Sequence, residues 1–171
     1  MEKDHGRPQI VLTQPHGPFD PYRLRGEFAR WLAGMPWTGF GTFTFRKERH
    51  SDRSCLGSFK TWRRDLWRDH GLACDATVVV EGSDRTRLHL HALLCMHYPR
   101  GSARYCAPAS PKLRRRAAWE LWKARYGRAR IDTPGMGSPY YVAKYCFKGG
   151  RAAEPRSHFL THPGWPDNIG R

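Results

Sequence analysis

Two histidines separated by one residue, His89 and His91, are side chains whose type and spacing suit metal chemistry. They lie in the segment 87–97, where apolar and polar residues alternate as they do in a β-strand. Residues two apart on a strand project to the same side, so both imidazoles would face one way. Two imidazoles held in this manner suit a divalent metal ion. The alternative is a chance pair on the surface of an edge strand.

Glu81 ends the preceding apolar segment, 76–81, and lies eight residues before His89. Between the two segments, residues 82–84 are Gly-Ser-Asp, a sequence typical of a turn. The two segments therefore most simply form an antiparallel hairpin. In such a hairpin Glu81 can lie beside both histidines and add a carboxylate oxygen, so the three residues together predict a metal site.

A second group of candidate residues lies in the tyrosine- and lysine-rich segment 138–148. At helical spacing Tyr141, Tyr145 and Lys148 share one face, and Lys144 stands at its edge. A phenol can attack phosphorus, but its pKa is about 10 and it needs activation at neutral pH. Neighbouring ammonium groups favour the phenolate, and a metal ion can polarise the phosphate under attack. The alternative is an amphipathic helix whose tyrosines are packing residues.

The charge of the chain indicates a polyanionic partner. Its 30 Lys and Arg against 15 Asp and Glu give a net charge of +15 on 171 residues, which is typical of a nucleic-acid-binding protein. A hydrophobic content of 39% excludes a disordered basic tail. No apolar run approaches the ~18 residues of a membrane span, and the N-terminus lacks the apolar core of a signal peptide. We therefore expect a cytoplasmic protein with no membrane partner. Five cysteines without a CxxC pair argue against a disulfide scaffold or zinc ribbon.

The elements that must position these residues follow from the hydrophobic periodicity. We expect helices over 22–33, 54–69, 111–126 and 138–148, and strands over 38–45, 76–81, 87–97 and 128–133. Without the first and last helices the order is βαββαβ, which is typical of a ferredoxin-like antiparallel sheet with two helices on one face. The fold class is therefore α+β, with an added C-terminal helix. The sheet face without these two helices must either be covered by other elements or bind a partner, and an exposed face would suit nucleic acid.

We expect one domain. Residues 1–21 are rich in proline and glycine and predict an irregular lead-in, residues 22–150 form the core, and residues 151–171 are polar and predict a loose tail.

Three motifs, in order over about residues 38–150, resemble those of the HUH endonucleases. His89-Leu90-His91 resembles the HUH motif, two histidines around a hydrophobic residue. The segment 141–148, YVAKYCFK, is similar to the Y-x-A-K-Y-x-x-K helix of two-tyrosine initiators of rolling-circle phages. The segment 41–45, GTFTF, resembles the first motif of Rep proteins, a strand that lies near origin DNA. The interval from Glu81 to His89 matches the carboxylate that many Rep proteins supply as a third ligand.

The resemblance implies a metal-dependent endonuclease that initiates rolling-circle replication of a small virus or plasmid. His89, His91 and Glu81 would hold Mg²⁺ or Mn²⁺ against the scissile phosphate of single-stranded DNA. The DNA would be a replication origin, with a hairpin. The chain contains no helicase motif, so a host helicase would unwind the duplex. The host would be a bacterial or archaeal cell, or one infected by a phage.

The resemblance also assigns roles to the tyrosine segment. Tyr145 would attack and leave a 5′-phosphotyrosine and a free 3′-hydroxyl, and Tyr141 would accept the second transfer. Single-tyrosine Rep proteins match Tyr145, so the order of attack stays open. Lys148 and Lys144 would stabilise developing charge or contact the DNA backbone.

The first motif and the basic helix faces predict the DNA-contacting residues, and binding should weaken steeply with salt. These residues are Thr42, Phe43, Thr44, Phe45, Arg63 and Arg64. An HUH transposase or relaxase would use the same chemistry. The alternative of another class is a non-catalytic basic module that binds RNA or DNA through Phe43, Phe45 and its arginines.

Overall fold

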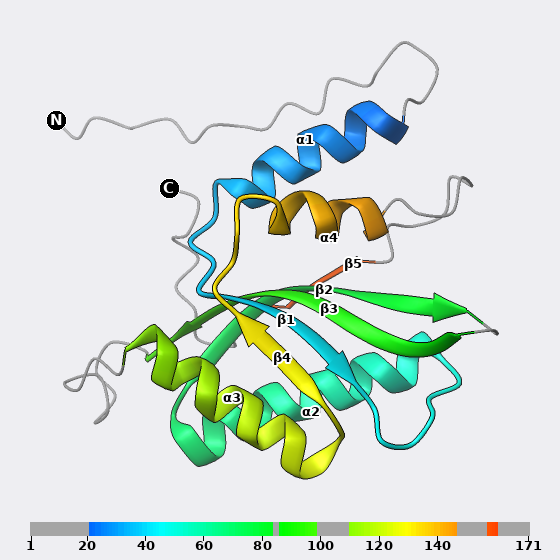
Figure 1. Cartoon of the computed structure of the whole chain (residues 1–171). Helices are drawn as coiled ribbons and strands as arrows, with labels where there is room; N and C mark the ends of the chain where they lie inside the picture. The colour runs from blue at the N-terminus through cyan, green and yellow to red at the C-terminus, as the bar shows by residue number, and fades with distance from the viewer. Residues whose placement is uncertain (1–20, 84–85, 99–109, 147–156, 161–171) are drawn as a thin grey trace, which may run out of the picture.

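The chain folds around one antiparallel sheet with helices on both faces (Figure 1). The structure is a computed structural model that describes residues 21–83, 86–98, 110–146 and 157–160. The strands are β1 (Gly39–Thr44), β2 (Ala73–Ser83), β3 (Thr86–His97), β4 (Ala129–Asp132) and β5 (Ser157–Leu160). The helices are α1 (Pro21–Ala33), α2 (Asp52–His70), α3 (Pro111–Arg125) and α4 (Ser138–Cys146).

The strand order is β4-β1-β3-β2-β5, and every neighbouring pair is antiparallel. Without β5 this is the order of a ferredoxin-like sheet, so the predicted α+β class is confirmed. None of the helices in these described ranges is long and apolar enough to cross a membrane.

The main core lies between the sheet and the helices α2 and α3 (Figure 1). Alternate residues of each strand point to this face, because the side-chain period of a strand is two. Phe43 of β1 lies at the centre, with its ring 4.8 to 5.4 Å from the rings of Phe59, Trp62 and Trp122. Each such aromatic pair adds about 1 kcal/mol beyond the burial of its area. This core fixes the sheet as a rigid platform for the residues on the opposite face.

Helix α2 begins two residues before its predicted start because Ser51 caps it. The side chain of Ser51 accepts a hydrogen bond from the backbone N–H of Ser54 in the first turn of the helix. The helix ends at Gly71, whose φ of 62° is left-handed and therefore favours glycine.

Helices α1 and α4 lie on the opposite face of the sheet (Figure 1). Ala29 and Leu32 of α1 pack against Val142 of α4, and this pair of helices covers Val79 of β2 and Leu93 of β3. The sheet face opposite α2 and α3 is therefore partly covered by α1 and α4, and α4 lies against β2 and β3.

The prediction of a loose tail over 151–171 is wrong for residues 157–160. They form β5, which pairs with Ala76–Val79 of β2. Without β5 this part of β2 would be an exposed sheet edge with unpaired backbone groups, and the short added strand covers it. Four residues are too few to show a period in the sequence. The remainder of 151–171 and the predicted lead-in over 1–20 lie outside the described residues.

Candidate active site

The β2–β3 hairpin brings Glu81, His89 and His91 together. Glu81 pairs directly with His89 in the predicted antiparallel register. A carboxylate oxygen of Glu81 lies 2.9 Å from Nε2 of His91 and 3.4 Å from Nε2 of His89. One ligand atom from each of the three residues lies within 4.8 Å of the other two, so the group could hold a metal ion. We call these three residues the triad.

In both imidazoles the ring nitrogen that points away from Glu81 has a hydrogen-bond partner, and this partner fixes the orientation of the ring. Nδ1 of His89 lies 3.0 Å from the backbone oxygen of Arg87, and Nδ1 of His91 lies 3.1 Å from Oγ1 of Thr42. A carbonyl oxygen can only accept, so Nδ1–H of His89 donates and its Nε2 keeps a free lone pair. When Thr42 accepts in the same way, both Nε2 atoms are available as ligands beside the carboxylate. The triad therefore fits a divalent cation in donor type and in ring orientation.

The protonation states of the triad also suit a metal ion. Burial and the neighbouring His89 lower the pKa of His91 below its usual value, although Glu81 opposes this shift. Burial raises the pKa of Glu81, but the hydrogen bond from Tyr145 and the two imidazoles outweigh it and leave the pKa below its usual value. At neutral pH His91 is therefore a neutral imidazole and Glu81 a carboxylate, which are the forms that bind metals.

Helix α4 lies over the sheet at β2 and β3 (Figure 1). Its two predicted tyrosines contact His91 of the triad. The hydroxyl of Tyr141 lies 3.5 Å from Nε2 of His91. The ring of Tyr145 stacks on His91 at 5.7 Å, and the two tyrosine rings are 4.8 Å apart. Hydrogen bonding with Tyr141, burial and the carboxylate of Glu81 raise the pKa of Tyr145 above its usual value. Both phenols are therefore close to the group that could hold a metal ion.

The position of α4 follows from its amphipathic sequence. Val142, Ala143 and Cys146 are buried against α1 and the sheet, and this fixes the helix rotation that turns Tyr141 and Tyr145 toward His91. At the start of the helix the side chain of Ser138 accepts a hydrogen bond from the backbone N–H of Gly135.

Of the two predicted lysines, Lys144 is exposed and its ammonium lies 5.6 Å from the centre of the Tyr145 ring. Lys148 lies outside the described residues.

Two residues of β1 belong to the site in ways that the sequence did not reveal. Phe40 lies parallel to the His91 ring at 6.2 Å and meets Tyr141 edge-on at 5.7 Å. The hydroxyl of Thr42 bonds His91, and the predicted contact of Thr42 with DNA stays a prediction. The available signal was that Phe40 and Thr42 are two apart on a strand and so share a face.

The prediction that Phe43 contacts DNA is wrong, whereas contact of Phe45 with DNA stays a prediction, because an edge of Phe45 lines a groove at the end of β1. Both rings are buried in the main core on the face covered by α2 and α3, because they alternate with Thr42 and Thr44. The alternative of a module that binds nucleic acid through these two rings loses Phe43 as a contact residue for the same reason. Thr44 points to the triad face and donates a hydrogen bond to the backbone oxygen of Arg128.

The two predicted arginines of α2 differ. Arg63 is largely buried, donates to the backbone oxygen of Cys74 at 2.6 Å and lies 3.9 Å from the carboxylate of Asp75. Its guanidinium holds α2 on β2, and its contact with DNA stays a prediction. Arg64 is exposed but lies on the helix layer on the other side of the sheet from the triad, and its contact with DNA stays a prediction.

Comparison with known proteins adds one finding. The family model of replication-associated protein ORF2 matches residues 38–150, which contain the elements from β1 to α4, the triad and both tyrosines. No match was found among curated proteins or among solved structures. The chain therefore belongs to the family of replication-associated protein ORF2.

Proposed function

We propose that the protein initiates rolling-circle replication by nicking and rejoining single-stranded DNA at an origin through a covalent phosphotyrosine. The observation that carries this proposal is the contact of both phenols with a histidine of the triad: Tyr141 reaches Nε2 of His91 and Tyr145 stacks on its ring. A phosphate next to the triad would be within reach of either hydroxyl. Membership of a replication-associated family favours replication over transposition or conjugative transfer.

In the first transfer Tyr145 Oη attacks phosphorus, and the bond from phosphorus to the 3′-oxygen breaks. The 5′-phosphate becomes an ester of Tyr145 and the other strand end becomes a 3′-hydroxyl that primes synthesis. The proton that the phenol loses is balanced by the proton that the 3′-oxygen gains. One phosphodiester bond is exchanged for another, so neither ATP nor another reactant is needed.

In the second transfer Tyr141 Oη attacks the newly made strand at the regenerated site and releases a 3′-hydroxyl. That 3′-hydroxyl attacks the phosphotyrosine of Tyr145, which rejoins the displaced strand and returns the proton to the Tyr145 phenol. The 4.8 Å separation of the two tyrosine rings lets both phenols serve one phosphate position without movement of α4. The ammonium of Lys144 lies next to the Tyr145 ring and would stabilise the negative charge that develops on the phosphate during attack. We assign the same role to Lys148.

Glu81, His89 and His91 would hold Mg²⁺ or Mn²⁺, which would polarise the phosphate under attack. Thr42 and the backbone oxygen of Arg87 keep the two imidazoles in the orientation that this requires. We further propose that the substrate is the hairpin of an origin, that a host helicase unwinds the duplex, and that the reaction takes place in the host cytoplasm.

The proposal is tested by incubating the protein with single-stranded DNA of randomised sequence and Mn²⁺, followed by SDS electrophoresis. Wild type should give a protein–DNA adduct that resists SDS, and sequencing of the bound DNA identifies the cleavage site. Tyr141→Phe/Tyr145→Phe and His91→Ala should give none. Tyr140→Phe is the matched control, since Tyr140 is on the same helix but half exposed, and it should form the adduct. An adduct that persists in the double variant would overturn the proposal.

A further inference from the structure

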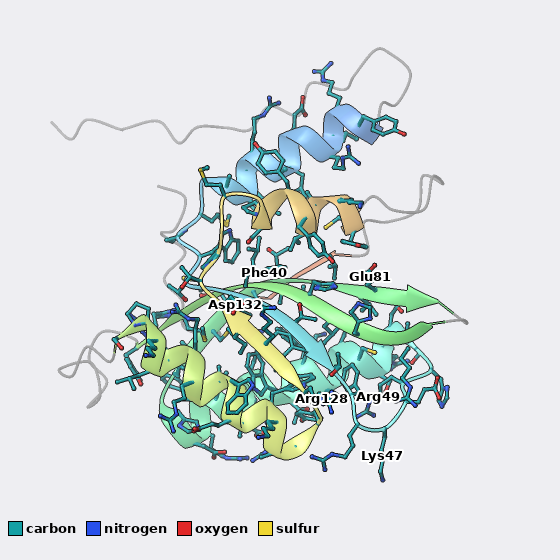
Figure 2. All side chains as sticks on the ribbon, in the orientation of Figure 1. Phe40, Lys47, Arg49, Glu81, Arg128 and Asp132 are labelled. Atoms are coloured by element: carbon teal, nitrogen blue, oxygen red, sulfur yellow. The ribbon has the colours of Figure 1, made fainter. Side chains whose placement is uncertain are left out.

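A groove with a volume of about 930 Å³ opens beside the triad, at the end of the sheet where β1 ends and where β3 and β4 begin. His89 belongs both to the triad and to the wall of this groove. The other walls carry Thr44 and four cationic side chains, Arg46, Arg87, Lys123 and Arg128. Figure 2 shows Arg128 at this end of the sheet.

The charge of the groove is positive and largely uncompensated. Glu48 is the one acidic residue of its lining. Within the ranges that the structure describes, no carboxylate lies within ion-pair distance of Arg87, Lys123 or Arg128, and all three are exposed. Cations gathered in a concave surface without acidic partners attract phosphate groups.

The groove has a firm frame. The backbone N–H of Thr44 donates to the backbone oxygen of Arg128, and the guanidinium of Arg46 donates to the backbone oxygen of Lys123. The ammonium of Lys123 is held over the Trp119 ring at 4.8 Å. These contacts join the end of β1 to α3 and β4, so the backbone that carries Arg46, Lys123 and Arg128 is held in place at the groove.

The groove and helix α4 lie at different positions along β3. Along β3 the groove is formed by the residues from Arg87 to His89, whereas α4 packs over His91 and Leu93 farther along the strand. In a phosphoryl transfer the attacking and leaving oxygens are roughly in line on opposite sides of phosphorus. If a phenol attacks from the side of α4, the leaving oxygen and the strand that bears it point toward the groove.

We propose that this groove binds the sugar-phosphate backbone of the DNA strand on the 5′ side of the cut, the segment whose end becomes the 3′-hydroxyl. The proposal rests on the proposed function, which supplies the direction of attack. The phenol oxygen bonds to phosphorus, the bond to the 3′-oxygen breaks, and that segment keeps no covalent link to the protein. Binding in the groove retains it, so the 3′-hydroxyl stays next to the phosphotyrosine and the reverse reaction can rejoin the strand.

A first test measures binding without cleavage. The fluorescence anisotropy of labelled oligothymidylate is followed in EDTA over a range of KCl concentrations, with wild type and Arg87→Gln/Arg128→Gln. Loss of two phosphate contacts should lower the slope of log Kobs against log salt by about 1.4 for single-stranded DNA, and should weaken binding about ten-fold or more at low salt. The matched control is Lys60→Glu, which also lowers the net charge from +15 to +13 but is exposed on α2, on the other side of the sheet. The control should keep the wild-type slope.

A second test establishes which strand end is bound. The DNA selected in the adduct assay is labelled at its 5′ end, cleaved, and captured with the protein without denaturant. Wild type and Lys60→Glu should retain the labelled 3′-hydroxyl fragment. Per molecule of adduct formed, Arg87→Gln/Arg128→Gln should release the fragment about ten times faster than either, whatever its adduct yield.

The outcomes separate the two proposals. Suppose that wild type forms the adduct but Arg87→Gln/Arg128→Gln has the wild-type salt slope or retains the fragment as well as wild type. Either result would overturn the proposed role of the groove without contradicting the nicking activity. Equal loss of binding in Lys60→Glu would also overturn it, because net charge alone would then account for the effect. Absence of any adduct from wild type would remove the nicking activity and, with it, the assignment of the 5′ segment to the groove.

Discussion

The hydroxyl of Thr42 has a role at the residue scale that its place in the sequence conceals. It lies 3.1 Å from Nδ1 of His91, the nitrogen turned away from Glu81. A partner at this nitrogen selects the tautomer and fixes the ring, so it acts on the metal without contacting it.

We predict that Thr42→Val weakens Mn²⁺ binding by about ten-fold or more, because valine keeps the shape of the side chain but cannot accept from Nδ1–H. Isothermal titration calorimetry with Mn²⁺ measures the change. Thr42→Ser should restore the affinity, and Thr44→Val, whose hydroxyl bonds the backbone of Arg128, should not alter it. Unchanged affinity in Thr42→Val would contradict the positioning role.

The triad could be predicted from the sequence, whereas its surroundings could not. Residues two apart on a strand and a carboxylate across a short turn are local relations, and local periodicity fixes them. Thr42 lies 49 positions from His91, so their contact depends on the register between β1 and β3. The periodicity of a strand shows that the side chains of Thr42 and Phe43 point to opposite faces of the sheet. It does not show which of these faces α2 and α3 cover, so the burial of Phe43 could not be predicted.

At the element scale, the end of β1 is held against the turn that leads into β4. The backbone N–H of Arg46 donates to the backbone oxygen of Tyr126, and Gly127 lies directly beneath this contact with a φ of 158°. A Cβ at Gly127 would be 2.6 Å from the backbone nitrogen of Arg46 and from the backbone oxygen of Thr44. Only a residue without a side chain allows this close approach.

We therefore expect Gly127→Ala to lower the free energy of unfolding by at least about 2 kcal/mol, since backbone atoms must move apart. Urea denaturation followed by circular dichroism measures it. Gly57→Ala is the control: a Cβ there meets nothing within 4 Å inside α2, and alanine should stabilise the helix by about 0.5–1 kcal/mol. Equal stability of the two variants would contradict the described packing at Gly127.

Helix α1 is an element whose contribution goes beyond the region matched by the family model, because it ends before residue 38. Leu32 is fully buried between α1, α4 and the sheet. It supports the rotation of α4 and, through it, the position of both tyrosines.

Leu32→Ala should cost about 3 kcal/mol of stability through the cavity that it leaves. It should also reduce adduct formation under conditions where the variant is still folded, because α4 loses its support. Leu24→Ala, on the same helix but partly exposed, should cost less than about 1 kcal/mol and leave the adduct unchanged. Gel quantification of the adduct together with a urea titration gives both results. A folded Leu32→Ala protein with full adduct yield would contradict the support by α1.

At the scale of the whole molecule, the order of elements was sufficient to predict the sheet. A βαββαβ order allows few arrangements of an antiparallel sheet with two helices on one face, and the strand order follows from them. The fifth strand was missed, because residues 157–160 are too short to show a pattern and their place is set only by the open edge of β2.

We predict that Phe159→Pro makes the protein self-associate, since proline removes a backbone donor from β5 and exposes the edge of β2. Size-exclusion chromatography with light scattering should show an increased mass at high protein concentration. Deletion of residues 151–171 should have the same effect. A monomer of unchanged stability in both variants would contradict the protective role of β5.

The central claim, that a phenol of α4 forms the bond to DNA beside the triad, is tested most directly by locating the bond. Trypsin cuts after Arg130, Lys144 and Lys148, so it separates the peptide 131–144, which carries Tyr141, from the peptide 145–148, which carries Tyr145. After nuclease trimming of the adduct, mass spectrometry should find a phosphonucleotide on the peptide 145–148 after the first cut. In Tyr145→Phe any adduct should be on the peptide 131–144. A nucleotide attached to any peptide outside α4 would contradict the account.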